Sequence, residues 1–159
     1  MYKHIADSYN ELHGAEQVRK LRSLLAHASL PSGDVLDVGC GTAHLAPFFS
    51  DRRYVGVDPC QELLDHAPRG VEVLCARGEE LPFGEESFPV VLSLTALHNY
   101  GDWRRGVEEL FRVCGGVALV GVLKKSSSHD AIVGALQELF VVSWRGDDVH
   151  DSLLVLHKL

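Results

Sequence analysis

Hydrophobic residues in the N-terminal stretch recur every three or four positions, with charged residues between them. This period is that of one face of an amphipathic α-helix. Pro31-Ser32-Gly33 then supplies the turn-forming residues that end such a helix. The pattern therefore predicts an N-terminal helix whose apolar face consists of Leu12, Ala15, Val18, Leu21, Leu25 and Ala28.

Beyond this helix, short apolar runs alternate with helical stretches. The predicted strands are Asp34–Val38, Tyr54–Val57, Val71–Leu74, Phe88–Leu94 and Val117–Leu123. The predicted helices start after Gly39–Thr42 and run to Phe49, and then cover Gln61–His66, Trp103–Val113 and Asp130–Leu139. Strands that alternate with helices in this way predict a parallel sheet covered on both faces.

The last two apolar runs, Phe140–Trp144 and Leu153–Leu156, follow one another with a Gly/Asp-containing loop between them. This arrangement predicts an antiparallel hairpin at one edge of the sheet. The expected fold class is therefore α/β, a doubly wound Rossmann-like sheet that is mostly parallel and ends in an antiparallel C-terminal hairpin.

The chain has 159 residues, the size of one ordinary domain. We expect a single domain over residues 1–159, with residues 1–30 as an N-terminal helix or lid and residues 34–159 as the core. No apolar run approaches the about 18 residues of a membrane span, and the polar N-terminus lacks a secretory apolar segment, so we expect a cytoplasmic protein. The net charge of −7 argues against a generally basic surface for nucleic acid.

Cysteine and histidine spacing gives no sign of a metal site. The four cysteines form no CxxC pair, and the nine histidines show no recognised ligand spacing. We therefore expect reduced thiols and no bound metal.

The stretch DVLDVGCGTAHL, Asp34–Leu45, carries the chemistry. Glycines directly after a strand let the backbone approach a ligand closely. Asp58 ends the next strand about 20 positions after Gly39, which is the usual spacing of a carboxylate that accepts hydrogen bonds from ribose hydroxyls. A ribose-bearing cofactor is the first expectation.

Two residues distinguish between cofactors. His44 occupies the position where a dinucleotide fingerprint requires a third glycine, which disfavours a nicotinamide dehydrogenase. Asp37 precedes the first glycine by two positions, and a carboxylate there favours a cofactor that carries an ammonium and a sulfonium charge.

The run VLDVGCGTA resembles motif I of class I S-adenosylmethionine-dependent methyltransferases. Further resemblances follow in family order: YVGVDP at Tyr54–Pro59, EELPFGEESFPVVLS at Glu79–Ser93, ALHNY at Ala96–Tyr100, and the lead-in YKHIADSYN at Tyr2–Asn10. The resemblance implies a seven-stranded sheet of order 3-2-1-4-5-7-6, S-adenosylmethionine as cofactor and S-adenosylhomocysteine as product.

The resemblance also implies a set of cofactor-binding residues: Tyr9, Asp37, Gly39, Cys40, Gly41, Asp58, Pro59, Arg77, Gly78, Glu79 and Leu94. Arg77 departs from the family, which usually has at this position an Asp that contacts the adenine amino group. Arginine cannot accept a hydrogen bond. Either Glu79 takes over this contact, or backbone groups at Arg77 and Gly78 hold the adenine.

His98 follows the Phe88–Leu94 strand at the end where the methyl group would lie. It is the candidate catalytic residue, and the alternative is a local hydrogen-bonding histidine. The sequence has neither an N-P-P-Y-type amide motif nor a catalytic cysteine motif, which disfavours amide-nitrogen and carbon-5 methylation.

The shortness of the chain bears on its partners. Few residues remain to cover an acceptor, and an open site suits a tRNA or protein acceptor better than a small molecule. Small members of the resembled family sometimes work with a zinc-binding activator subunit, so we expect an activator or a second copy as partner, and no membrane. The alternative function is a catalytically silent subunit of the same fold, which Arg77 favours.

Overall fold

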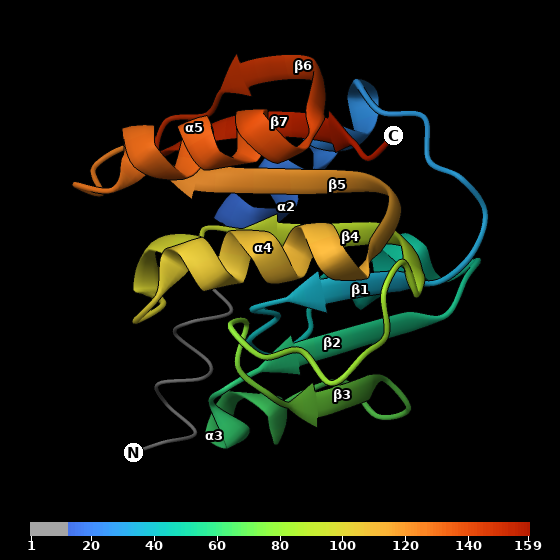
Figure 1. Ribbon diagram of the computed structural model, residues 1–159. Coiled ribbons are helices and arrows are strands. Elements are labelled where there is room, and N and C mark those ends of the chain that lie inside the picture. The colour runs from blue at the N-terminus through green and yellow to red at the C-terminus, as the bar shows by residue number, and fades with distance from the viewer. Residues whose placement is uncertain (1–12) are drawn as a thin grey trace.

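The computed structural model describes residues 13–159 (Figure 1). The lead-in Tyr2–Asn10, and with it Tyr9, lies outside these residues. Within them, seven strands form one sheet in the order β3-β2-β1-β4-β5-β7-β6. The strands are β1 (Val35–Val38), β2 (Tyr54–Asp58), β3 (Glu72–Cys75), β4 (Phe88–Leu94), β5 (Cys114–Leu123), β6 (Val141–Asp147) and β7 (Asp151–His157).

The pairing confirms the predicted fold class. The neighbours β3, β2, β1, β4 and β5 pair in parallel, whereas β7 pairs antiparallel with both β5 and β6. The strand order is the one that the resemblance implies. Strands β6 and β7 form the expected C-terminal hairpin at one edge.

Helices cover both faces of the sheet. They are α2 (Gly14–Ala26), α3 (Gln61–Leu64), α4 (Trp103–Val113) and α5 (His129–Leu139), with short 3-10 turns η2 (Ala46–Phe49) and η3 (Leu97–Asn99). Figure 1 shows α4 and α5 in front of the sheet and α2 behind it.

Successive residues of the central strands point into two separate cores. Leu36 and Val91 pack with α4 and α5 in one core, whereas Val35 and Val90 pack with α2 and η2 in the other. Because both faces are buried, these strands are almost continuously apolar in sequence.

The structure corrects the prediction of a helix after the glycine turn. We expected a helix up to Phe49, but only the four-residue 3-10 turn η2 forms there. Pro47 lies in its first turn, a position that proline tolerates because the amide there has no intrahelical partner, so the proline does not explain why the turn ends at Phe49. The free helical N–H groups expected for a ligand are therefore reduced to those of the turn.

Helix α2 forms as expected, and Val18, Leu21, Leu25 and Ala28 of the predicted face pack in the core, but polar residues are buried beside them. Its buried residues are Gly14, Gln17, Lys20, Leu21 and Leu24, whereas Ala15 of the predicted apolar face is exposed. Among the strands, β5 begins at Cys114 rather than Val117, and β6 and β7 extend beyond the predicted runs.

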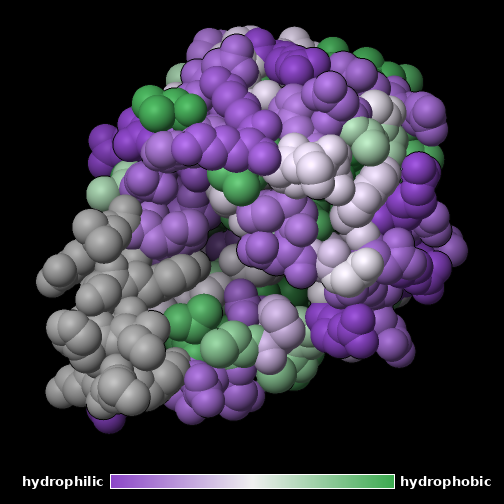
Figure 2. Space-filling view, turned by 90° about the vertical axis from the view of Figure 1, so that its left-hand side faces the viewer, coloured by the Kyte–Doolittle hydropathy of each residue, from purple (hydrophilic) through white to green (hydrophobic). Residues whose placement is uncertain are grey.

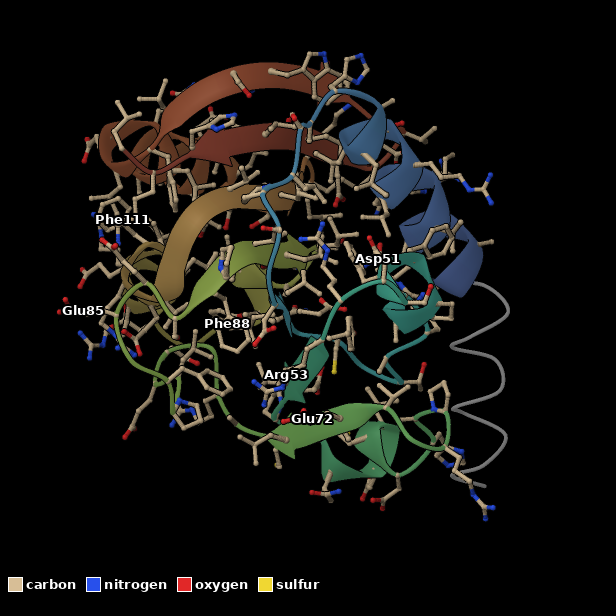
Figure 3. The ribbon with its side chains drawn as sticks, turned by 90° about the vertical axis from the view of Figure 1, so that its right-hand side faces the viewer. Asp51, Arg53, Glu72, Glu85, Phe88 and Phe111 are labelled. Atoms are coloured by element: carbon tan, nitrogen blue, oxygen red, sulfur yellow. The ribbon has the colours of Figure 1, made fainter. Side chains whose placement is uncertain are left out.

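Strand β1 lies at the point where the strand order reverses, with β2 on one side and β4 on the other. In open α/β sheets, ligands bind outside the carboxyl ends of the strands at this point. Figure 2 looks onto the carboxyl ends of the parallel strands, and the molecular surface there is hollowed near the centre. Figure 3 shows the opposite side of the molecule, where the parallel strands begin. There Arg53 lies beside Glu72, and the two side chains form an ion pair at 2.7 Å.

Candidate functional site

The glycine turn after β1 is fitted closely between its neighbours. Gly39 has a φ of +82°, and a Cβ added there would lie 2.7 Å from Cβ of Ala96. The amides of Gly39 and Cys40 both donate to the carbonyl of Val57 in β2, at 2.8 and 3.0 Å. A side chain at Gly39 would collide with Ala96 and would be strained at this positive φ, so glycine is required at this position.

Asp58, at the carboxyl end of β2, is held in place by two backbone amides. Its Oδ2 accepts from the Gly41 amide at 3.0 Å, and its Oδ1 accepts from the Cys60 amide at 2.9 Å. Each carboxylate oxygen keeps a further lone pair. Asp58 is therefore an oriented acceptor for two neighbouring hydroxyl groups.

A pocket of ≈ 270 Å³ lies between the ends of β1, β2 and β4. It is lined by His13, Gly39, Asp58, Pro59, Leu63, Leu94, Thr95, Ala96, Asn99 and Tyr100. Four of the predicted cofactor residues are in this lining: Gly39, Asp58, Pro59 and Leu94. The pocket thus combines a carboxylate, a bare backbone turn and apolar walls, which suits a nucleoside.

Asp37 lies behind the turn rather than in the pocket lining. Its side chain is buried and accepts a hydrogen bond from the Tyr54 hydroxyl at 2.6 Å. Burial raises the pKa of Asp37 to about 7, with the Tyr54 bond opposing the shift and the charge of Asp58 adding to it. A cation nearby would favour its ionised form.

Cys40 contributes its backbone to the turn, whereas its thiol packs away from the pocket. A Cβ at Gly56 of β2 would lie 2.7 Å from Sγ of Cys40. Burial raises the pKa of this thiol well above its usual range, so it stays protonated and unreactive.

None of the predicted cofactor-binding residues in the loop after β3 lines the pocket. The Arg77 side chain is 70% exposed and forms an ion pair with Oε2 of Glu79 at 3.1 Å. The same Glu79 oxygen accepts from the Asp102 amide at the start of α4. Gly78 instead packs against the side chain of Tyr100. Arg77 and Glu79 therefore pair with each other at the rim, outside the pocket lining.

His98 lies on η3, one turn beyond the end of β4. It is half-buried and absent from the pocket lining, and its buried Nδ1 has no hydrogen-bond partner among residues 13–159. Burial lowers the pKa of His98, which favours a neutral imidazole that can accept a proton.

A buried polar cluster beside the pocket escaped the sequence reasoning. Nζ of Lys20 lies 3.3 Å from Oδ2 of Asp151 and 2.8 Å from Oγ1 of Thr95, and Thr95 donates to Asp151 at 2.5 Å. Gln17 accepts from Lys20 at 3.0 Å and donates to the Leu94 carbonyl at 3.1 Å. Thr95 lines the pocket and has an unusual φ of +57°. The cluster thereby joins α2, β4 and β7 at the pocket wall.

Neither a metal site nor a membrane span is found in the described part of the chain. Residues 13–159 contain no group of three or more His, Cys, Asp or Glu side chains that would hold a metal ion. None of their helices is long and apolar enough to cross a membrane.

These observations fit S-adenosylmethionine better than a dinucleotide. Asp58 suits a ribose, and the turn presents the bare backbone of Gly39 to the pocket beside it. The buried carboxyl of Asp37 suits a positively charged group nearby, which a pyrophosphate would not provide.

Comparison with known proteins also indicates a methyltransferase. The methyltransferase domain family matches residues 36–120. An uncharacterized protein of Methanocaldococcus jannaschii is 35% identical over 101 residues, which is 62% of this chain and 48% of that protein. The tRNA (carboxymethyluridine(34)-5-O)-methyltransferase of Arabidopsis thaliana is 31% identical over 128 residues, 74% of this chain and 32% of that protein. The chain thus spans about half or less of the length of these relatives.

A solved structure shares the fold over almost the whole chain. It is the complex between the Haloferax volcanii Trm112 methyltransferase activator and a proposed methyltransferase, with a TM-score of 0.76 and 16% identity, covering 98% of this chain and 93% of that one. At this identity the likeness concerns the fold. Together with the family match over residues 36–120, it places the chain in the methyltransferase domain family, among the class I S-adenosylmethionine-dependent methyltransferases.

Proposed function

We propose that this chain methylates tRNA, using the pocket between β1, β2 and β4 to hold S-adenosylmethionine. The observation that carries the cofactor part is Asp58, oriented by the amides of Gly41 and Cys60 at the mouth of the glycine turn. The acceptor part is supported by the curated tRNA methyltransferase that matches 74% of the chain.

Each part of the pocket has a role in holding the cofactor. Asp58 would bind the ribose hydroxyls, and Pro59 and Leu94 would flank the base. Asp37 lies behind the glycine turn, and the negative charge of its ionised form would stabilise the positive charge of a cofactor on the other side of the turn. Backbone groups of Gly39, Cys40 and Gly41 would lie against the amino-acid part, and Tyr9 is proposed as a further contact from the N-terminal segment.

The bound cofactor supplies an electrophilic methyl group, so the protein mainly has to align the acceptor with it. Proximity and orientation of this kind are worth on the order of 7–11 kcal/mol. His98 is the proposed group that takes a proton from the acceptor, because its imidazole is neutral and its Nδ1 lacks a partner among the described residues.

We further propose that a second protein chain takes part. The net charge of −7 gives little attraction for RNA, so a basic partner would contribute to RNA binding. The fold likeness to a chain whose structure was solved in complex with the Trm112 activator supports an activator subunit as this partner.

The cofactor part is tested by titration calorimetry with S-adenosylhomocysteine. We expect binding, and we expect Asp58→Ala to weaken it at least about tenfold, since two charge-assisted hydrogen bonds are lost. Asp51→Ala is the matched control, because Asp51 is 79% exposed and is seen from the opposite side of the molecule (Figure 3). Equal affinity of the Asp58 variant and the control would refute the ribose role of Asp58.

The acceptor part is tested by purifying the protein from its native cell, identifying co-purifying chains by mass spectrometry and supplying labelled S-adenosylmethionine. We expect label in a fraction that ribonuclease removes. Label that only protease removes would indicate a protein acceptor. Cofactor binding without transfer to any fraction, even with the co-purifying chains present, would favour the silent subunit.

A further inference from the structure

Strand β6 is the outermost strand of the sheet on the hairpin side, and within residues 13–159 no strand pairs with its outer edge. Figure 1 shows it at the upper margin of the molecule. Its side chains are alternately exposed and half-buried along the strand. An edge strand of this kind presents backbone N–H and C=O groups to which the strand of another chain can pair.

The pairing of β6 with β7 determines which backbone groups point outward. At the hairpin end, the Asp148 amide donates to a carbonyl of β7 at 2.8 Å. Hydrogen-bonded pairs alternate along an antiparallel ladder, so Gly146 also bonds to β7, whereas Arg145 and Asp147 direct their N–H and C=O groups to the free edge. The register is regular over residues 144–147, since the irregularity of this ladder lies before them. The free edge therefore offers the backbone of Arg145 and Asp147 for pairing.

The side chains of these two residues carry opposite charges on one face of the strand. Residues two positions apart in a strand share a face, and Arg145 and Asp147 are both exposed. The Asp147 side chain is 69% exposed and forms an ion pair at the rim with Nζ of Lys124, at 3.4 Å. When two such strands lie antiparallel about Gly146, Arg145 of each copy lies opposite Asp147 of the other. The edge is thus complementary to itself in charge.

Gly146 suits the centre of such a pairing. It lies opposite Gly146 of the second copy in a non-hydrogen-bonded pair, the position at which two strands approach most closely, with Cα atoms about 4.5 Å apart. The Trp144 ring covers this glycine, since a Cβ added there would lie 2.4 Å from Cη2 of the ring. His27 stacks on the same ring at a centroid distance of 3.9 Å and so fixes it. The centre of the edge therefore has no side chain of its own that would keep a second copy away.

We propose that two copies of this chain pair antiparallel through their β6 edges, with the two-fold axis at Gly146. Arg145 of each copy exchanges two backbone hydrogen bonds with Asp147 of the other, and the two side chains form an ion pair. The contact is isologous, because the same segment serves on both sides. Three strands separate β6 from β1, so the pocket at the end of β1 stays open. The proposal does not depend on the cofactor or the acceptor.

The contact is short, so we expect a weak dimer, which sedimentation equilibrium of the full chain detects between about 10 µM and 1 mM. Arg145→Asp leaves two acidic side chains on the edge, and Asp147→Arg leaves two basic ones. Each variant alone should dimerise at least about tenfold more weakly, because like charges then lie opposite each other. An equimolar mixture of the two variants should pair as tightly as the unsubstituted chain, since opposite charges face each other again.

Arg69→Asp is the matched control, because it makes the same change of charge at an exposed position in the loop before β3, the other edge of the sheet. It should dimerise like the unsubstituted chain. Thermal unfolding checks that each variant is folded, and the double variant Arg145→Asp/Asp147→Arg should dimerise again. A chain that is monomeric over the whole range, a dimer that neither single variant weakens, or one that Arg69→Asp weakens equally would overturn the proposal. So would folded single variants that fail to pair when mixed.

Discussion

At the scale of single residues, the most consequential group is the carboxyl of Asp37. It lies in the interior, close to the glycine turn, with the Tyr54 hydroxyl as its hydrogen-bond donor. Burial raises its pKa to about 7 from an ordinary value near 4. The folded protein therefore holds a proton at this site over a pH range in which the unfolded chain has lost it.

The sign of the resulting pH dependence follows from linkage. Between about pH 4 and pH 7 the folded state binds more protons than the unfolded state at Asp37, so its contribution to stability falls as the pH rises. A positively charged ligand favours the carboxylate, so binding of S-adenosylmethionine should release a proton below pH 7. We expect affinity up to about tenfold weaker at pH 6 than at pH 8.

Calorimetry in two buffers of different ionisation enthalpy measures the proton released. Asp37→Asn removes this titration but leaves that of the ligand, so the difference between the two proteins isolates Asp37. A pH profile that is the same in both would show that Asp37 does not respond to the cofactor's charge.

A second prediction at this scale concerns the glycine beneath Tyr100. Alanine favours a helix over glycine by about 0.5–1 kcal/mol, but a Cβ at Gly106 would strike the Tyr100 ring. Gly106→Ala should therefore destabilise the protein by about 1–3 kcal/mol in urea unfolding. Gly134 in α5 is the control, since a Cβ there meets nothing within 4 Å and Gly134→Ala should be neutral or stabilising. Equal effects at both positions would contradict the close fit of the ring.

The sequence predicts some of these residues well and others not at all. Gly39 and Asp58 are recognisable because the turn and the strand end lie at a fixed spacing along the chain. Tyr100 and Thr95 owe their roles to contacts with distant elements and, for Thr95, to a backbone conformation that no residue pattern encodes. The unusual pairing of Arg77 with Glu79 at the rim is visible only in three dimensions.

At the scale of elements, α2 shows where periodicity is insufficient. Its length and position follow the hydrophobic pattern, but the helix turns Gln17 and Lys20 inward because the ends of β4 and β7 present Thr95, Asp151 and a carbonyl to them. Hydrophobic patterning assigns polar residues to the surface, so it places Leu21 correctly in the core but misses that Gln17 and Lys20 extend the buried face.

The buried ion pair gives a prediction for this element. Both side chains of the Lys20–Asp151 pair are almost fully buried, at 1% and 0% exposure. Lys20→Met should cost about 3–5 kcal/mol in urea unfolding, because it leaves the charge of Asp151 buried without its partner. The double variant Lys20→Met/Asp151→Val should recover much of this loss. A double variant as unstable as the single one would show that packing, rather than charge, dominates here.

At the scale of the whole molecule, the alternation of strands and helices was sufficient to predict the sheet and its hairpin. The parallel strands β1, β2, β4 and β5 are largely buried on both faces, so their sequences are mostly apolar and easy to recognise, whereas the edge strand β3 is largely exposed. The acceptor is harder to predict, because its recognition depends on the surface around the pocket and on any chain that binds there. Surface loops such as the one holding Arg77 carry no periodicity from which their conformation follows.

The Lys20–Asp151 pair also has a consequence for the order in which the protein is made. Lys20 belongs to the first described helix and Asp151 to the last described strand, so the two meet only after Asp151 itself has left the ribosome. Thr95 gains its hydrogen bond to Asp151 only at the same moment. The pocket wall is thus completed late in folding, and a nascent chain that lacks β7 can join Lys20 of α2 to Thr95 only without the carboxylate that balances the lysine charge.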